Sequence, residues 1–341
     1  MQGLTPAQIA ASPFDVRVVD PHDRGGSAWT PEQIRVMGAG TASPHLVLGS
    51  LNIGEAQSQR SYFRAIPRAA LGPASPHAPA HFAVAFWAQP WRVMAMRSID
   101  QLIRTGYDGV CLDAVDACHS TWARSQGVNP MAAMAALVTD LAGYARARRR
   151  GFKVWAMNGE ALLASEPVLA GLDGLFRENL YVTAAGRRRP AEEIAASLAL
   201  LKRMIAAGKD VIAVERVDSA EMAAAIDAAA ERDGLGSYIG RLEPGAGAES
   251  ERGNRPPVPA PRTPPVPPRR RELGEPTRGA AAFQPDTFTF GPAETGAMPH
   301  GLRPAPRGPV QLQADSSGPS AMGLYLQRSC GADHPDFRAS R

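Results

Sequence analysis

Asp113 is the residue of this sequence best placed to do chemistry. It follows the apolar run 107–112 in the stretch GYDGVCLDAVDACHSTW (106–122), a run that Asp108 and Gly109 interrupt. A carboxylate at the end of a buried strand is costly to remove from water unless it is hydrogen-bonded or takes part in a reaction. The sequence therefore predicts a catalytic carboxylate at Asp113. The plainer alternative is an N-cap for the helix that follows.

Polar residues also end other apolar segments of the chain. Eight candidate strands begin near residues 14, 46, 83, 109, 152, 172, 210 and 237. The polar residues near their ends are Asp20, Glu55, Asp113, Asn158, Glu178 and Glu215. A (β/α)8 barrel brings its strand ends to one face, whereas an open doubly wound sheet has its site at one switch point, often with a glycine-rich phosphate turn. Neither GxGxxG nor GxxxxGK[ST] follows a strand here, so the pattern favours a barrel.

Helical segments alternate with these strands. Their expected ranges are 5–12, 27–39, 91–106, 129–150, 190–208 and 219–233. A threonine cap followed by proline is typical of a helix start, as at Thr5 and Thr30, and Gly106 is typical of a helix end. This alternation predicts a parallel sheet with crossover helices. The expected fold class is α/β, a (β/α)8 TIM barrel over residues 1–243.

The composition argues against several classes of protein. The formal net charge of the 341 residues is only +4, and three of the 37 basic residues are lysines. The folded part has no basic helix with interleaved aromatics, so we expect no nucleic-acid binding. The three cysteines have neither zinc spacing nor a disulfide pattern, so we expect no metal and no cofactor. We also expect no membrane span and see no signal peptide.

The composition changes from about residue 244. The segment RPPVPAPRTPPVPPRRR (255–271) is dominated by proline and arginine, and no apolar periodicity follows it. Such a composition favours polyproline II or disorder over a packed core. We therefore divide the chain into a barrel, 1–243, and a disordered Pro/Arg-rich tail, 244–341. A tail of this kind can dock a partner with an SH3-like groove or an anionic surface; the plainer interpretation is a flexible extension.

Several segments together resemble the endo-α-1,4-polygalactosaminidase family, glycoside hydrolase family 114. In the family's order they are SPFDVRVVD (12–20), LNIGEAQSQRSYF (51–63), GYDGVCLDAVDA (106–117), MNGEALL (157–163), LDGLFRENLYV (172–182) and GKDVIAVERV (208–217). They cover most of the predicted barrel, and the tail has no counterpart. The patterns GEAxxxRxYF and GYDGVxLDxxDA are specific in combination. The resemblance implies a secreted, periplasmic or cell-surface protein.

The resemblance also implies cleavage of α-1,4-linked galactosamine-type polymers by two carboxylates. It places one on Asp113 and the other on Glu178 in FRENLY. In such a pair, one group protonates the leaving oxygen and the other attacks the anomeric carbon or activates water. We interpret Asp113 as the nucleophile or base and Glu178 as the general acid; a solvated loop acid is the plainer interpretation of Glu178. The alternative function is a non-catalytic carbohydrate-binding barrel in envelope or exopolysaccharide assembly.

Other family-like positions imply contacts with an amino-sugar polysaccharide. Glu55 and Arg60 are expected to pair as a clamp near the strand ends, with a purely structural pair as the alternative. Trp87 is expected either to stack on a sugar ring or to pack in the core. Asn158 and Tyr181 are candidates for hydrogen bonds to sugar hydroxyls.

Acidic residues around the strand ends suit a cationic substrate. Asp20, Asp116 and Glu215 are candidates for contacts with the amino group of a deacetylated sugar, and a structural hydrogen-bond acceptor is the alternative for Asp116. An acidic face on a mildly basic chain would attract such a polymer.

The sequence departs from the family pattern in two places. Residue 89 is glutamine where relatives tend to carry an acid, so sugar binding is expected to differ here. The additional opening strand of relatives has no counterpart. Either the true start lies upstream, or the segment 237–243 helps to close the sheet.

Overall fold

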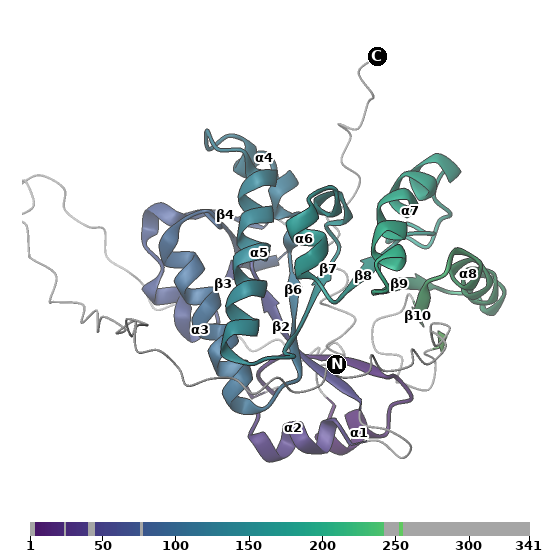
Figure 1. The fold of residues 1–341 in the computed structure, drawn as a ribbon, viewed down its shortest axis with the longest axis horizontal. Coiled ribbons are helices and arrows are strands. Elements are labelled where there is room, and N and C mark those ends of the chain that lie inside the picture. Colours follow the sequence, from purple (N-terminus) through teal and green to yellow (C-terminus); the bar gives the residue numbers. More distant parts are fainter. Residues whose placement is uncertain (1–3, 24, 40–44, 76–77, 242–251, 255–341) are drawn as a thin grey trace, which may run out of the picture. The chain divides into compact units, whose positions relative to one another are not determined.

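The computed structural model describes residues 4–23, 25–39, 45–75, 78–241 and 252–254. Its main element is an eight-stranded sheet with the order β1-β2-β6-β7-β8-β9-β10-β11 (Figure 1). The strands are β1 (Val16–Val19), β2 (Leu46–Asn52), β6 (Gly109–Asp113), β7 (Lys153–Met157), β8 (Gly174–Glu178), β9 (Asp210–Val217), β10 (Gly236–Arg241) and β11 (Arg252–Asn254). The first seven strands in this order pair in parallel, and β11 joins β10 antiparallel. The predicted α/β class of TIM-barrel type is confirmed.

The inner face of the sheet is filled by side chains of its own strands. The buried members of this inner cluster are Leu48, Cys111, Trp155, Phe176 and Val214. Val16 and Val18 of β1 and Tyr238 of β10 pack against the same cluster, although these two strands are the first and last of the parallel set. The rings of Phe14 and Tyr238 lie 5.2 Å apart. The sheet is therefore curled as in a barrel, and the segment expected to help close it forms β10.

Helices cover the outer face of the sheet. The long helices are α3 (Gln89–Thr105), α5 (Pro130–Arg148), α7 (Ala191–Ala206) and α8 (Ala220–Asp233). Helix α3 packs on β2 and β6, α5 on β7, α7 on β9, and α8 on β9 and β10. The short helices are α1 (Pro6–Ala10), α2 (Pro31–Met37), α4 (Thr121–Arg124) and α6 (Glu166–Gly171). Within the described residues the 3₁₀ helices are η1 (Ser61–Ala65), η2 (Arg68–Ala70), η3 (Val115–His119) and η4 (Glu160–Ala164).

The predicted helix ends have the expected chemistry. Thr5 and Thr30 each form a capping box with the glutamine three residues later, and a proline occupies the first helical position. Gly106 ends α3 with a left-handed φ of 92°, which glycine adopts at little cost. The chain can therefore turn at once from α3 into β6, the strand that carries Asp113.

Part of the arginine content has a structural role. Arg17 of β1 has no solvent exposure and donates hydrogen bonds to the backbone carbonyls of Ala10, Ser12 and Met37. Burial lowers the pKa of Arg17, although the charge of Asp15 acts in the opposite direction. This cation satisfies carbonyl groups at the ends of α1 and α2.

The strand predicted near residue 83 does not belong to the main sheet. It forms β5 (Ala78–Val84), which lies between β3 (Glu55–Gln57) and β4 (Leu71–Ser75) in a separate antiparallel sheet. In the main sheet β2 pairs directly with β6. The prediction of this segment as a barrel strand was wrong, because antiparallel pairing within residues 55–84 satisfies its backbone instead.

Two Asp-Gly pairs fix the register at the amino ends of the strands. The Asp108 carboxylate accepts a hydrogen bond from Val47 N at 2.9 Å, and the Asp173 carboxylate accepts one from Val154 N at 2.9 Å. Each aspartate also donates its own N–H to the carbonyl of the same valine. A Cβ at the glycine that follows Asp108 would lie 2.4 Å from the Lys153 carbonyl oxygen. These pairs hold β6 against β2 and β8 against β7.

The predicted tail, 244–341, lies outside the described residues except for β11. Among the helices that the structure describes, none is long and apolar enough to cross a membrane.

Candidate active site

Asp113 and Glu178 both face the inside of the curled sheet. Side chains alternate between the two faces of a strand, so residues two apart share a face. Cys111 and Phe176 belong to the inner cluster, and the two acids follow them by two residues in β6 and β8. Both acids end their strands and are 3% and 2% exposed, respectively. The structure therefore places both predicted carboxylates on the inner face, at the carboxyl ends of the strands.

The two acids come from strands that have one neighbour in common. β7 lies between β6 and β8, so the backbones of the two acids are separated by about two strand spacings, or about 10 Å. Burial, and next the negative charges of Asp113 and Glu178, raise the pKa of the Cys111 thiol. Both carboxylates are thus close enough to the Cys111 thiol for their charges to disfavour its ionisation.

A left-handed backbone follows each of the three strands that build this site. The residues are Ala114 after β6, Asn158 after β7 and Asn179 after β8, with φ values of 54°, 60° and 53°. They are the non-glycine residues with positive φ in the described part of the chain. Such backbone strain is uncommon and concentrates at functional sites. It turns the chain sharply after Asp113 and Glu178, and the cap of η3 is Ala114 and not Asp113.

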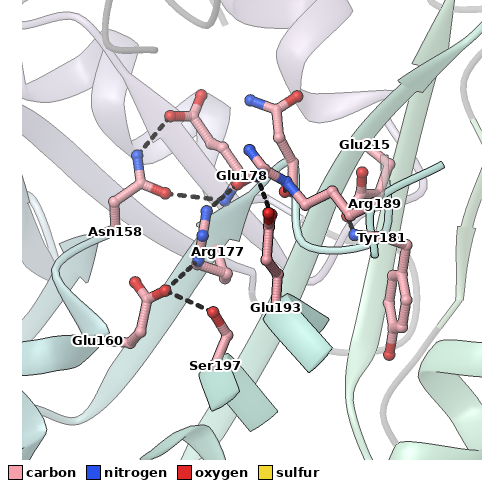
Figure 2. A network of polar contacts seen from close by, with 10 residues as sticks. Asn158, Glu160, Arg177, Glu178, Tyr181, Arg189, Glu193, Ser197 and Glu215 are labelled. Atoms are coloured by element: carbon pink, nitrogen blue, oxygen red, sulfur yellow. Dashed lines mark hydrogen bonds and ion pairs between the residues drawn. The ribbon is translucent and has the colours of Figure 1, made fainter. Parts of the chain in front are cut away.

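Asn158 contacts Glu178 twice. Its amide nitrogen donates to Glu178 Oε2 at 2.7 Å, and its amide oxygen accepts from the backbone N–H of Glu178 at 2.9 Å (Figure 2). Asn158 is 5% exposed, and its own N–H donates to the carbonyl of Phe176 at 2.7 Å. The amide predicted to bind sugar hydroxyls is thus engaged with the candidate acid.

Arg177 forms an ionic network beside Glu178. Its guanidinium lies 2.7 Å from Glu160 Oε1, and the hydroxyl of Ser197 donates to the same oxygen at 2.9 Å (Figure 2). Arg177 also donates to the backbone carbonyl of Glu178. Strand β8, η4 and α7 are joined in this way around the candidate acid.

Asp116 lies in η3, three residues after Asp113, and is partly buried. Burial raises its pKa to about 7, and the negative charges of Asp113 and Glu55 act in the same direction. The charge of Arg177 partly offsets them. Asp116 is therefore close enough to sense three other charged groups of the site, and it changes charge near neutral pH.

The predicted pairing of Glu55 with Arg60 was wrong. Arg60 binds Asp20 at 2.5 Å and approaches His22 Nδ1 at 2.6 Å, while Glu55 binds His81 at 2.8 Å. Burial raises the pKa of Asp20, but hydrogen bonds from His22 and Arg60 outweigh burial and hold this pKa at about 2. The negative charge of Asp20 is thus engaged by Arg60, which joins the loop after β1 to the chain that follows β3.

Trp87 packs against other aromatic side chains. Its ring stacks on Trp122 with centroids 5.6 Å apart and an interplanar angle of 27°, and Phe86 meets it edge-on at 4.8 Å. A Cβ on Gly72 would lie 2.5 Å from the Trp122 ring, so β4 covers this ring closely. These contacts support the packing alternative for Trp87.

Tyr181 and Glu215 hold the loop after β8. The carboxylate of Glu215 accepts from Tyr181 N at 2.9 Å and Val182 N at 3.3 Å and has no solvent exposure. Burial raises the pKa of Glu215 to about 7 against the effect of these bonds. The Tyr181 hydroxyl donates to Asp233 at the end of α8, at 2.9 Å. Glu215 follows Val214, which faces inward, so it faces the outer side of the sheet.

Sequence reasoning missed several polar residues of the site. Asn52 ends β2 directly opposite Asp113, and its side chain accepts from Glu55 N at 2.8 Å. Its position at the end of an apolar run was a usable signal. His81 gave none, because its partner Glu55 is 26 positions away, and the contact of His22 with Arg60 spans 38 positions. The described residues contain no group of three or more His, Cys, Asp or Glu side chains arranged to hold a metal ion.

Sequence comparison relates this chain to known proteins. Residues 5–249 match the family described as glycoside-hydrolase family GH114. An uncharacterized protein of Deinococcus radiodurans is 30% identical over 237 residues, which cover 68% of this chain and 74% of the relative. An uncharacterized protein of Thermotoga maritima is 27% identical over 232 residues, which cover 64% of this chain and 69% of that relative.

Two solved structures share the fold. The glycoside hydrolase domain of PelA from Pseudomonas aeruginosa has a TM-score of 0.54 and 17% identity, covering 70% of this chain and 91% of that one. Aspergillus fumigatus Ega3, solved in complex with galactosamine, has a TM-score of 0.51 and 15% identity, covering 71% and 95%. The resemblance noted from the sequence motifs is confirmed: this chain belongs to glycoside-hydrolase family GH114.

Proposed function

We propose that this protein cleaves α-1,4-linked galactosamine-type polysaccharide with Asp113 and Glu178. The observation that carries the proposal is the placement of both acids on the inner face, at the carboxyl ends of β6 and β8, in a GH114 chain. Active sites of β/α barrels lie at this end of the strands. The complex of the similar Ega3 fold with galactosamine supports an amino sugar as the substrate unit.

The two carboxylates divide the reaction between them. Glu178 donates a proton to the leaving glycosidic oxygen, and Asp113 either attacks the anomeric carbon or removes a proton from the attacking water. Carboxyl groups about 5–5.5 Å apart give retention of configuration, whereas about 6.5–9.5 Å leaves room for a water and gives inversion. Either course uses side chains alone and needs no cofactor.

The amino group of the substrate meets acids near Asp113. Asp116 lies three residues after Asp113, and the negative charge of Glu55 acts on Asp116. Asp20, in contrast, is ion-paired with Arg60, and Glu215 faces the outer side of the sheet. We therefore assign the contact with a deacetylated sugar to Asp116 and Glu55. Since such polymers lie outside cells, the enzyme acts in the periplasm, at the cell surface or after secretion.

The direct test is the release of reducing ends from a partially deacetylated α-1,4-linked galactosaminoglycan. Asp113→Asn and Glu178→Gln are each expected to lower the rate by about 10²-fold or more, because each removes one partner of the proton and bond exchange. Circular dichroism melting curves check that both variants are folded. Glu192→Gln, an exposed acid in the first turn of α7, is the matched control and keeps full activity.

Two results would contradict the proposal. Undiminished activity in both folded variants would remove the two acids from catalysis. Binding of the polymer by the wild-type protein without any release of reducing ends would make the chain a non-catalytic carbohydrate-binding barrel.

A further inference from the structure

Asn158 occupies an unusual position for a residue expected to bind sugar. It follows β7 with a φ of 60° and is 5% exposed. Three hydrogen bonds attach it to β8: one from its backbone N–H to Phe176 and two between its side chain and Glu178. Asparagine tolerates left-handed backbone better than most residues, because its short polar side chain can bond locally. Here that backbone directs the amide at the neighbouring strand end.

The orientation of the Asn158 amide follows from chemistry. The backbone N–H of Glu178 can only donate, so the amide oxygen must face it. The NH₂ group of the amide is then left facing Glu178 Oε2 at 2.7 Å. Exchanging the two ends of the amide would set donor against donor at the backbone and leave an acceptor against the carboxylate. The donor that reaches Oε2 is therefore fixed.

We propose that Asn158 is a positioning residue that holds the Glu178 carboxyl group in one orientation and directs its transferable proton to Oε1. This role rests on the proposed function of Glu178 as the general acid. When Glu178 is protonated, Oε2 accepts the Asn158 N–H as a carbonyl-type oxygen, so the proton resides on Oε1. When that proton passes to the leaving oxygen, the same N–H stabilises the carboxylate that forms. Asn158 thereby assists the loss of the proton without touching the substrate.

Asn158→Asp tests this role with little change in shape. Aspartate keeps the left-handed backbone and an oxygen facing Glu178 N, but it replaces the donor to Oε2 with a negatively charged acceptor. In the reducing-end assay we expect kcat to fall about 10- to 100-fold while KM stays within about threefold, because orientation matters for the reacting geometry. We also expect the alkaline limb of the pH–rate profile to move up by about one pH unit, since the carboxylate loses its donor.

The other charged groups near Glu178 stay in place in this variant. They include Asp113 on β6 and Arg177 on β8, with its partner Glu160 in η4. Asp116 in η3, whose charge is coupled to Asp113 and Arg177, is also unchanged, while Glu215 on β9 faces the outer side. A shift of the alkaline limb of the pH–rate profile therefore reports the change at residue 158. Asn129→Asp is the matched control, because Asn129 is exposed and caps α5 through its side chain, and aspartate caps equally well. It is expected to change neither kcat nor the limb.

Asn158→Gly is the second variant, because glycine accepts a φ of 60° without strain and removes the amide entirely. We expect the same fall in kcat and a smaller shift of the limb in the same direction. An unchanged limb and a kcat within about twofold of wild type in the folded variants would overturn the positioning role. Failure of both variants to fold would assign Asn158 to folding and would also overturn it. If the Glu178→Gln enzyme remains active, the proposed function of Glu178 itself is wrong, whatever the Asn158 variants show.

Discussion

At the scale of single residues, alternation along short strands explains why two acids distant in sequence lie on one face of the sheet. Asp113 and Glu178 were found from the sequence because each ends an apolar run or matches a family motif. Their neighbours were harder to predict. Arg60 binds Asp20 across 40 positions and His81 binds Glu55 across 26, and such pairs depend on tertiary structure that no local pattern encodes. Proximity within GEAQSQR suggested the wrong partner for Arg60.

Asp116 gives a prediction for stability against pH. Its pKa is raised from 3.8 to about 7 in the folded state, first by burial and then by Asp113, so the folded chain keeps a proton that the unfolded chain has lost. Stability due to this group therefore falls as pH rises from about 4 to about 7 and then stays level. Asp116→Asn removes this loss. The melting temperature of the variant relative to wild type is expected to be higher at pH 8 than at pH 5.

The control for this prediction is Asp23→Asn, which makes the same exchange in the loop after β1 and keeps the acceptor for Ser27 N. An Asp116→Asn variant whose melting temperature differs from wild type by the same amount at both pH values would contradict the raised pKa.

At the scale of elements, the Asp-Gly pairs show how a motif associated with function also carries structure. In GYDGVCLD, Asp113 belongs to the candidate site, whereas Asp108 bonds to Val47 at the opposite end of the strand. The same arrangement recurs at Asp173 and Val154. An acid at the amino end of one parallel strand thus accepts a backbone N–H from the neighbouring strand. Without the acid, that N–H would lack a partner in the sheet. The segments that begin at Asp108 and Asp173 thus resemble each other because both aspartates make this hydrogen bond.

Asp108→Ala is expected to lower the free energy of unfolding by about 1–2 kcal/mol, because the Val47 N–H loses its acceptor. Asp108→Asn keeps an acceptor oxygen and is expected to lose less, which makes it the matched control. Urea unfolding measures both, and kcat per folded molecule is expected to stay unchanged. Equal stability of the alanine and asparagine variants would show that the hydrogen bond contributes nothing.

The segment near residue 83 marks the limit of element prediction. Its apolar run satisfies every local rule for a strand, and the structure does make it one. Membership of a sheet depends on which partners satisfy its backbone, and here these partners lie within residues 55–75. Strand content was therefore predictable from the sequence, whereas assignment to the barrel was not.

At the scale of the whole molecule, the alternation of strands and helices was sufficient to predict the α/β barrel class, because parallel strands need crossover helices. The order of the seven parallel strands follows the chain, so the strand ends met as expected. The separate sheet β3-β5-β4 and the ion pair of Arg60 with Asp20 in the loop after β1 were not predictable, because they depend on long-range contacts. The fold thus supplies the two acids, and the insertion between β2 and β6 supplies further polar groups near them.

The central claim is that Asp113 and Glu178 act on opposite sides of one sugar linkage. A crystal structure of the Glu178→Gln variant with a bound α-1,4-galactosamine oligosaccharide tests it most directly. The account predicts that a glycosidic oxygen lies within hydrogen-bond distance of the substituted amide at position 178, with the carboxylate of Asp113 facing the anomeric carbon directly or through one water. An oligosaccharide bound at the carboxyl ends of the strands with both side chains out of reach of any linkage would contradict it.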